Sequence, residues 1–144
     1  MKKIRSMVVA VVTAAAVTIG LALPTTATAA AATLEQKRFV WRSYMTSGSC
    51  TIEPGATWTL YSNGTARLDA TVSSLDGDDA WLMWAHLKDD SGSLLADIQV
   101  YGSSSTKFVK NLPNRERSYR WLAKGQFDPE LFDLVERMSL GKHC

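Results

Sequence analysis

Hydrophobic and polar residues alternate most regularly between residues 56 and 101, and this alternation predicts two β-hairpins in series. The first hairpin turns at the Asn-Gly pair of residues 63–64, a pair typical of tight turns. A three-residue loop sets Trp58 opposite Leu68, whereas a two-residue loop would set it opposite Asp69. Because a slip of one residue turns every side chain to the other face, we predict the three-residue loop.

The second hairpin is predicted to turn at residues 89–92, with Lys88 paired to Ser93 across a four-residue loop. In this register one face of the hairpin is apolar throughout and the other is mixed. The mixed face supplies the candidate ligand-binding residues Leu82, Trp84, His86, Leu95 and Asp97. Strands with apolar groups on both faces are usually central and covered, so we expect a ligand or a covering helix there.

The C-terminal segment carries the pattern of an amphipathic α-helix. Asp128 suits the N-cap and Pro129 the first helical position. Apolar residues within 131–138 recur at helical spacing, and Gly141 suits the position just after the helix.

The whole pattern indicates about seven short strands followed by this one helix. We therefore predict a mainly β fold with an antiparallel up-and-down sheet. Such a sheet would curl into a small barrel or sandwich, with the C-terminal α-helix over one face or an open end.

Residues 1–29 have the pattern of a secretory signal peptide, with a basic start, an apolar run and a small-residue cleavage site. We expect residues 30–144 to form a single secreted domain without a stable membrane anchor. The formal charge of +2 includes Lys2, Lys3 and Arg5. Without them, 13 of the 16 basic residues remain, against 14 acidic residues. This near balance of charge does not indicate a nucleic-acid partner.

Cys50 and Cys144 are the only cysteines, and in an exported protein they predict a disulfide. Two free thiols are the alternative. Metal ligation by the cysteines with His143 lacks a fourth ligand and the usual close spacing, so we expect no metal and no cofactor. Whether the acidic loop with Asp76, Asp78 and Asp79 binds calcium stays open, because its spacing is not that of an EF-hand.

Two further groups of residues could take part in catalysis or binding. His86 and Asp97 are expected to lie diagonally across the second hairpin, where a carboxylate can orient a general base, yet no nucleophile is tied to them by the sequence. Residues 107–124 are strongly basic, whereas residues 53–97 are acidic. The two segments either neutralise one another or leave a surface for an anionic partner.

Several motifs resemble a family of small secreted actinobacterial proteins that is catalogued as a domain of unknown function. They are Trp58-Thr59-Leu60 with Asn63-Gly64-Thr65, Asp79-Ala80-Trp81-Leu82-Met83, Gly125-Gln126-Phe127-Asp128-Pro129 and His143-Cys144. The resemblance covers most of the chain after the signal peptide and implies no activity or site. The first hairpin is also faintly similar to lipocalin-like barrels, although the early Gly-x-Trp of lipocalins is absent.

These observations favour a secreted, non-enzymatic β-domain that binds a small ligand or an extracellular protein. The mixed face of the second hairpin motivates this hypothesis. One alternative is an extracellular enzyme inhibitor, indicated by export, small size and a disulfide. The other is a small hydrolase that uses His86 and Asp97.

Overall fold

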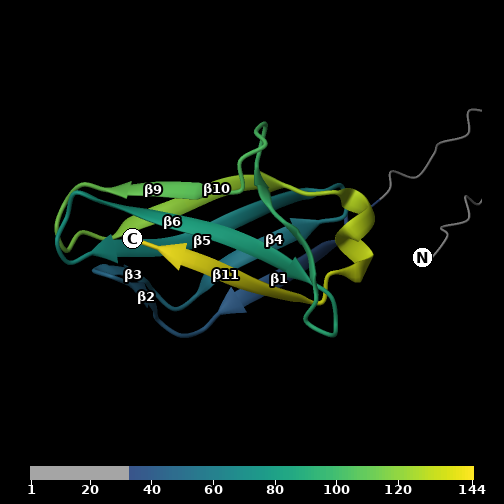
Figure 1. Ribbon diagram of the computed structural model, residues 1–144, viewed down its shortest axis with the longest axis horizontal. Coiled ribbons are helices and arrows are strands. Elements are labelled where there is room, and N and C mark those ends of the chain that lie inside the picture. Colours follow the sequence, from purple (N-terminus) through teal and green to yellow (C-terminus); the bar gives the residue numbers. More distant parts are fainter. Residues whose placement is uncertain (1–32) are drawn as a thin grey trace, which may run out of the picture. The chain divides into compact units, whose positions relative to one another are not determined.

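The segments with alternating hydrophobic and polar residues form two antiparallel β-sheets, which face one another across one hydrophobic core (Figure 1). The computed structural model describes residues 33–144, and residues 34–144 form one compact unit. The predicted signal peptide, residues 1–29, lies outside the described residues.

The first sheet, sheet A, has seven strands in the central order β1-β4-β5-β10-β8, while β2 pairs with β3 and β3 pairs with β5. Its strands are β1 (Gln36–Trp41), β2 (Met45–Ser47), β3 (Cys50–Ile52), β4 (Ala56–Tyr61), β5 (Thr65–Ser74), β8 (Gln99–Val100) and β10 (Tyr119–Gln126). Because β5 pairs with β10 along most of its length, the connectivity is not up-and-down, and that prediction is wrong.

The second sheet, sheet B, is built around β6, whose side chains alternate between buried and half-buried. Its strands are β6 (Asp79–Lys88), β7 (Leu94–Asp97), β9 (Phe108–Leu112) and β11 (Arg137–His143). The strand β11 pairs along one edge of β6, and β7 and β9 pair along the other. In Figure 1, β6 and β11 of sheet B pass in front of β4 and β5 of sheet A.

The core lies between the two sheets and is dominated by large side chains from both. Trp58 of β4 meets Phe108 of β9 edge to face, with ring centroids 5.1 Å apart. Trp58, Trp81, Leu68 and Met83 are almost completely buried. Burial of such side chains stabilises a fold by about 1.5–3 kcal/mol each, so this layer supplies most of the driving force.

The first hairpin has the predicted register. Trp58 lies opposite Leu68 and Leu60 lies opposite Ala66. Gly64 adopts a left-handed φ of 84°, which is the conformation that the three-residue loop requires of a glycine.

The second hairpin does not have the predicted register. The pairs are Lys88 with Leu94, Leu87 with Ala96 and His86 with Asp97, and the register shifts between Leu87 and Lys88. Beyond Ile98 the chain leaves sheet B, because β8 pairs with β10 in sheet A. A bulge and a change of sheet therefore replace the long regular strand that alternation alone predicts.

The predicted C-terminal α-helix is also wrong. Asp128 does cap a helical segment, since its carboxylate accepts a hydrogen bond of 2.9 Å from the Glu130 N–H, with Pro129 at the start. That segment, η1 (Pro129–Leu134), is a short 3-10 helix, and the chain continues as β11. The free edge of β6 binds the remaining residues as a strand, so pairing overrides the helical periodicity. The described fold is mainly β, without a closed barrel and without a C-terminal α-helix.

The disulfide Cys50–Cys144 is present and joins β3 of sheet A to the residue that follows β11 of sheet B. Its prediction is confirmed. A helix of the length and hydrophobicity needed to span a membrane is not found within residues 33–144.

Candidate functional site

Four of the five predicted ligand-binding residues share the outer face of sheet B. Leu82, Trp84 and His86 alternate on β6 with fully buried neighbours, and all three are half-buried. Asp97 of β7 lies directly opposite His86, rather than diagonally as predicted. Leu95 falls at the irregular step of the β6–β7 register and packs against the core instead.

His86 and Asp97 form a close polar pair. The Nδ1 atom of His86 is 2.5 Å from Oδ1 of Asp97, and the two side chains are 30% and 31% exposed. A carboxylate in this position holds the imidazole ring in one orientation. The other ring nitrogen, Nε2, is directed toward β11.

Gly141 of β11 makes room for the two rings of this face. It lies opposite Trp84, and a Cβ atom on Gly141 would be 3.1 Å from His86 Nε2 and 3.5 Å from Trp84 Cε3. The indole and the imidazole therefore lie against the backbone of β11 where a larger side chain would crowd them. Leu82, Trp84, His86, Asp97 and Gly141 are called the Trp84 face below.

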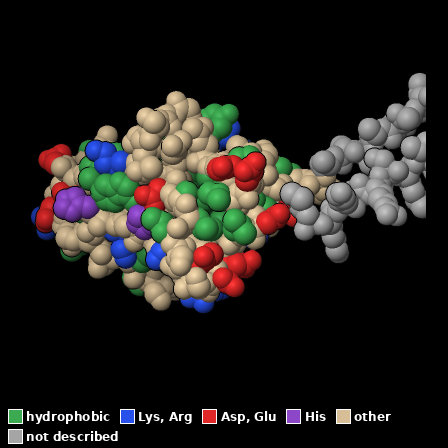
Figure 2. Space-filling view, turned by 45° about the vertical axis from the view of Figure 1, so that its right-hand side comes forward, with side chains coloured by type: hydrophobic (Ala, Val, Ile, Leu, Met, Phe, Trp, Pro, Cys, Tyr) green, Lys and Arg blue, Asp and Glu red, His purple; other side chains and the backbone are tan. Residues whose placement is uncertain are grey.

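The Trp84 face is uncovered in the described structure, because β11 extends sheet B instead of crossing over it. Val109 and His143 flank Leu82 on the neighbouring strands, and both are exposed. Figure 2 shows hydrophobic side chains beside the two histidine patches on the visible surface of the molecule. The sequence suggested Gly141 only as a helix terminus, so its part in this face was missed.

A serine lies beside the histidine–aspartate pair. Ser139 of β11 is directly opposite His86, so Ser139, His86 and Asp97 lie on three adjacent strands. Among the described residues, however, His86 is hydrogen-bonded to Asp97 and not to Ser139. The Nε2 atom of the imidazole lies close to Gly141 instead, and within residues 33–144 no base is hydrogen-bonded to the serine hydroxyl.

The structure does not bring the carboxylates of the acidic loop together into a metal site. Asp79 turns toward the disulfide and accepts hydrogen bonds from the hydroxyls of Ser49 and Ser74. Within residues 33–144, the one trio of potential metal-ligand atoms combines Asp79 with Cys50 and Cys144. Because those sulfurs are bonded to each other, they are not thiolates, and the trio is unsuited to a metal ion.

Asp79 gives the stability of the protein a defined pH dependence. The hydroxyls of Ser74 and Ser49 lower the pKa of its carboxyl below the ordinary value. Its contribution is therefore complete above the pKa of an unfolded aspartate and is lost as the pH falls through the folded pKa. We expect acidification to lower the free energy of unfolding less steeply in Asp79→Asn than in the wild type.

Denaturant titrations from neutral pH to strongly acidic pH measure this difference. The pKa of Asp69 and Asp89 is also lowered, by Arg120 and by Ser91 respectively, so only the slope difference between the two proteins reports Asp79. Parallel slopes for the wild type and Asp79→Asn would contradict the assignment.

A family model of unknown function, DUF6294, matches residues 57–144. The chain belongs to this family. The matched part of this DUF6294 protein begins in β4 and contains the whole Trp84 face. The predicted resemblance to a family of unknown function is thus confirmed, whereas actinobacterial origin, secretion and likeness to lipocalins stay predictions. No curated protein and no solved structure matches the chain.

Proposed function

We propose that this DUF6294 domain is a non-enzymatic binding module that docks a protein partner on the Trp84 face. The observation that carries the proposal is the uncovered centre of sheet B, where Trp84 and His86 lie together over Gly141. A tryptophan on an open face combines a large apolar area with a polar edge, and such residues often dominate binding energy at interfaces.

The surroundings of Trp84 also suit a partner surface. Leu82 and the exposed Val109 add apolar area on one side, while the His86–Asp97 pair adds polar groups on the other. Mixed patches of this kind support both desolvation and directional hydrogen bonds. Leu82, Trp84 and His86 lie on one face of β6 in an open sheet, and such a face suits a flat macromolecular partner better than an enclosed small ligand.

Trp84→Ala is expected to reduce the bound fraction of the partner about thirtyfold at limiting concentration, the effect of losing a hot-spot residue. The measurement is native mass spectrometry of the full chain isolated from its producer, in which a bound partner adds a reproducible mass. Leu75→Ala is the matched control, because Leu75 is an exposed leucine in the connection between β5 and β6, away from the Trp84 face. Equal retention of the added mass in Trp84→Ala and the control would reject the Trp84 face.

A small hydrolase is the second candidate function, favoured only by the neighbouring positions of Ser139, His86 and Asp97. A panel of nitrophenyl esters separates it from the first. Turnover that disappears in both Ser139→Ala and His86→Ala would establish the hydrolase. Turnover unchanged by these variants would exclude these three residues as its active site.

A further inference from the structure

The outer face of sheet A brings together cations that are far apart in the sequence. Arg38 of β1 lies opposite Thr59 of β4, Thr59 lies opposite Arg67 of β5, and Arg67 lies opposite Lys124 of β10. These four residues are called the Arg67 row. The strands are about 4.8 Å apart, so the row spans four strands and carries three positive charges across about 15 Å.

Asp69, an acid in the middle of this face, is already paired with an arginine. Asp69 accepts two hydrogen bonds from Arg120, at 3.1 Å from Nε and 2.8 Å from the terminal nitrogen. In the part of the chain that the structure describes, the ion pairs are Lys37–Glu136, His86–Asp97 and Arg120–Asp69. Arg38, Arg67 and Lys124 are exposed, and these ion pairs include none of them. Only the Arg120–Asp69 pair joins the basic segment 107–124 to the acidic segment 53–97, so the two segments neutralise one another only in part.

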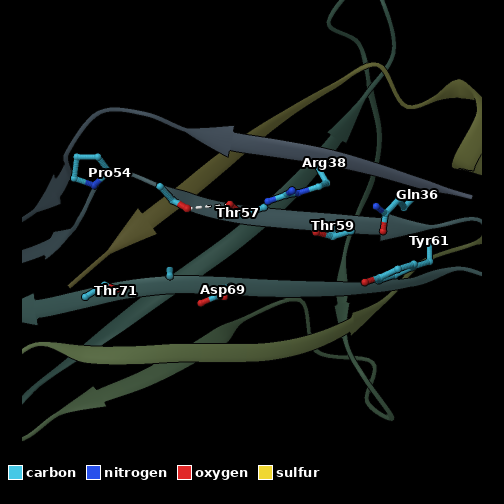
Figure 3. Close-up of a pocket in the computed structure, with 10 residues that line it drawn as sticks. Gln36, Arg38, Pro54, Thr57, Thr59, Tyr61, Asp69 and Thr71 are labelled. Atoms are coloured by element: carbon cyan, nitrogen blue, oxygen red, sulfur yellow. Dashed lines mark hydrogen bonds between the residues drawn. The ribbon is translucent and has the colours of Figure 1, made fainter.

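Two hollows adjoin the row. One, of about 490 Å³, lies over β1, β4 and β5, and the other, of about 590 Å³, lies over β4, β5 and β10. They share Thr59, Tyr61 and Asp69, so together they form one trough across the strands. Figure 3 shows Arg38 reaching from β1 over β4, with threonine hydroxyls and Tyr61 beside it.

We propose that this trough binds an acidic polysaccharide, with the Arg67 row contacting successive carboxylates of the polymer. The three cations supply the charge complementarity. The hydroxyls of Thr57, Thr59 and Tyr61 and the amide of Gln36 supply donors and acceptors for sugar hydroxyls between the charges. An open trough across a sheet accommodates an extended chain, which an enclosed pocket would not.

A polysaccharide fits these residues better than a nucleic acid. Single-stranded nucleic acids need exposed aromatic rings on which bases stack. Here Tyr61 is half-buried, and the exposed Tyr101 ring already has the Lys124 ammonium group on one face, 3.7 Å from its centroid. The described residues also contain fewer basic than acidic side chains, unlike a typical nucleic-acid-binding domain.

The test is a titration of the purified full-length protein with polygalacturonate, using its methyl-esterified form as an uncharged polymer of the same backbone. We expect binding to polygalacturonate that weakens as ionic strength rises, and little binding to the ester. The double variant Arg67→Gln/Lys124→Gln should lower the affinity about tenfold or more, because it removes two of the three charges.

Lys107→Gln is the matched control, since Lys107 is an exposed lysine that precedes β9 of sheet B. It should bind polygalacturonate as the wild type does, and all variants should keep the wild-type melting temperature. Absence of binding at low salt, equal binding of the ester, or full binding by the double variant would overturn the proposal. Preference for a single-stranded oligonucleotide over polygalacturonate would also overturn it and assign the trough to nucleic acid.

Discussion

Replacing both cysteines with alanine is expected to lower the free energy of unfolding by roughly 4–5 kcal/mol. The bond joins residues 94 positions apart, so it restricts nearly all of the unfolded domain. It also attaches the chain end after β11 to β3, and thereby holds one end of sheet B against sheet A. Alanine is the suitable replacement because Cys50 is fully buried, where a serine hydroxyl would add a desolvation penalty of its own.

Urea denaturation of the wild type and of Cys50→Ala/Cys144→Ala measures the loss, and hydrogen exchange locates it. Exchange should rise first in β2, β3 and the last residues of β11. Adding a reductant should destabilise the wild type and leave the double variant unchanged. A loss below about 1 kcal/mol would show that packing between the sheets alone holds the chain end.

The two hairpins show which part of the fold can be predicted from local sequence. In the first, the Asn-Gly turn and the alternation of both strands agree, so the pairing of Trp58 with Leu68 follows from the sequence. In the second, alternation continues past Asp97, yet Gln99 and Val100 pair with β10 of the other sheet. A bulge and a change of sheet depend on contacts with β10, and β10 lies about twenty residues further along the chain.

The C-terminal segment shows a second conflict between the local sequence pattern and the tertiary structure. Its cap was predicted correctly, because Asp128 and Pro129 act within one turn. Its continuation was not, because Met138 and Leu140 also fit a strand that has one face toward the core. The segment forms a strand because it pairs with the free edge of β6. This pairing is a tertiary feature that cannot be read from the periodicity of the segment itself.

The candidate sites show the same difference between local pattern and long-range pairing. Leu82, Trp84 and His86 lie on one strand, so their common face was predictable from a period of two residues. The contribution of Gly141 was not, since it depends on pairing between β11 and β6. The Arg67 row joins residues 38, 67 and 124, and no local pattern relates them. Only the unequal distribution of charge along the chain indicated that an anionic partner was possible.

Gly64→Ala is expected to destabilise the protein by about 3 kcal/mol, against about 1 kcal/mol for Gly102→Ala. Both glycines have left-handed φ values, 84° and 74°, so both substitutions share the backbone penalty. They differ in surroundings. A Cβ atom on Gly64 would lie 2.5 Å from the carbonyl oxygen of Phe127, whereas nothing lies within 4 Å of one on Gly102.

The difference between the two variants isolates the contact between the first hairpin and the segment that leads into η1. The Phe127 N–H donates a hydrogen bond of 2.8 Å to the Gly64 carbonyl, so the same backbone that would clash is also held in place. A carbonyl group cannot rotate aside as a side chain can, and relief requires Phe127 and the start of η1 to move. Thermal and urea unfolding measure both variants against the wild type. Equal losses would mean that this segment yields freely, and that the hairpin tip does not fix the path of the chain toward β11.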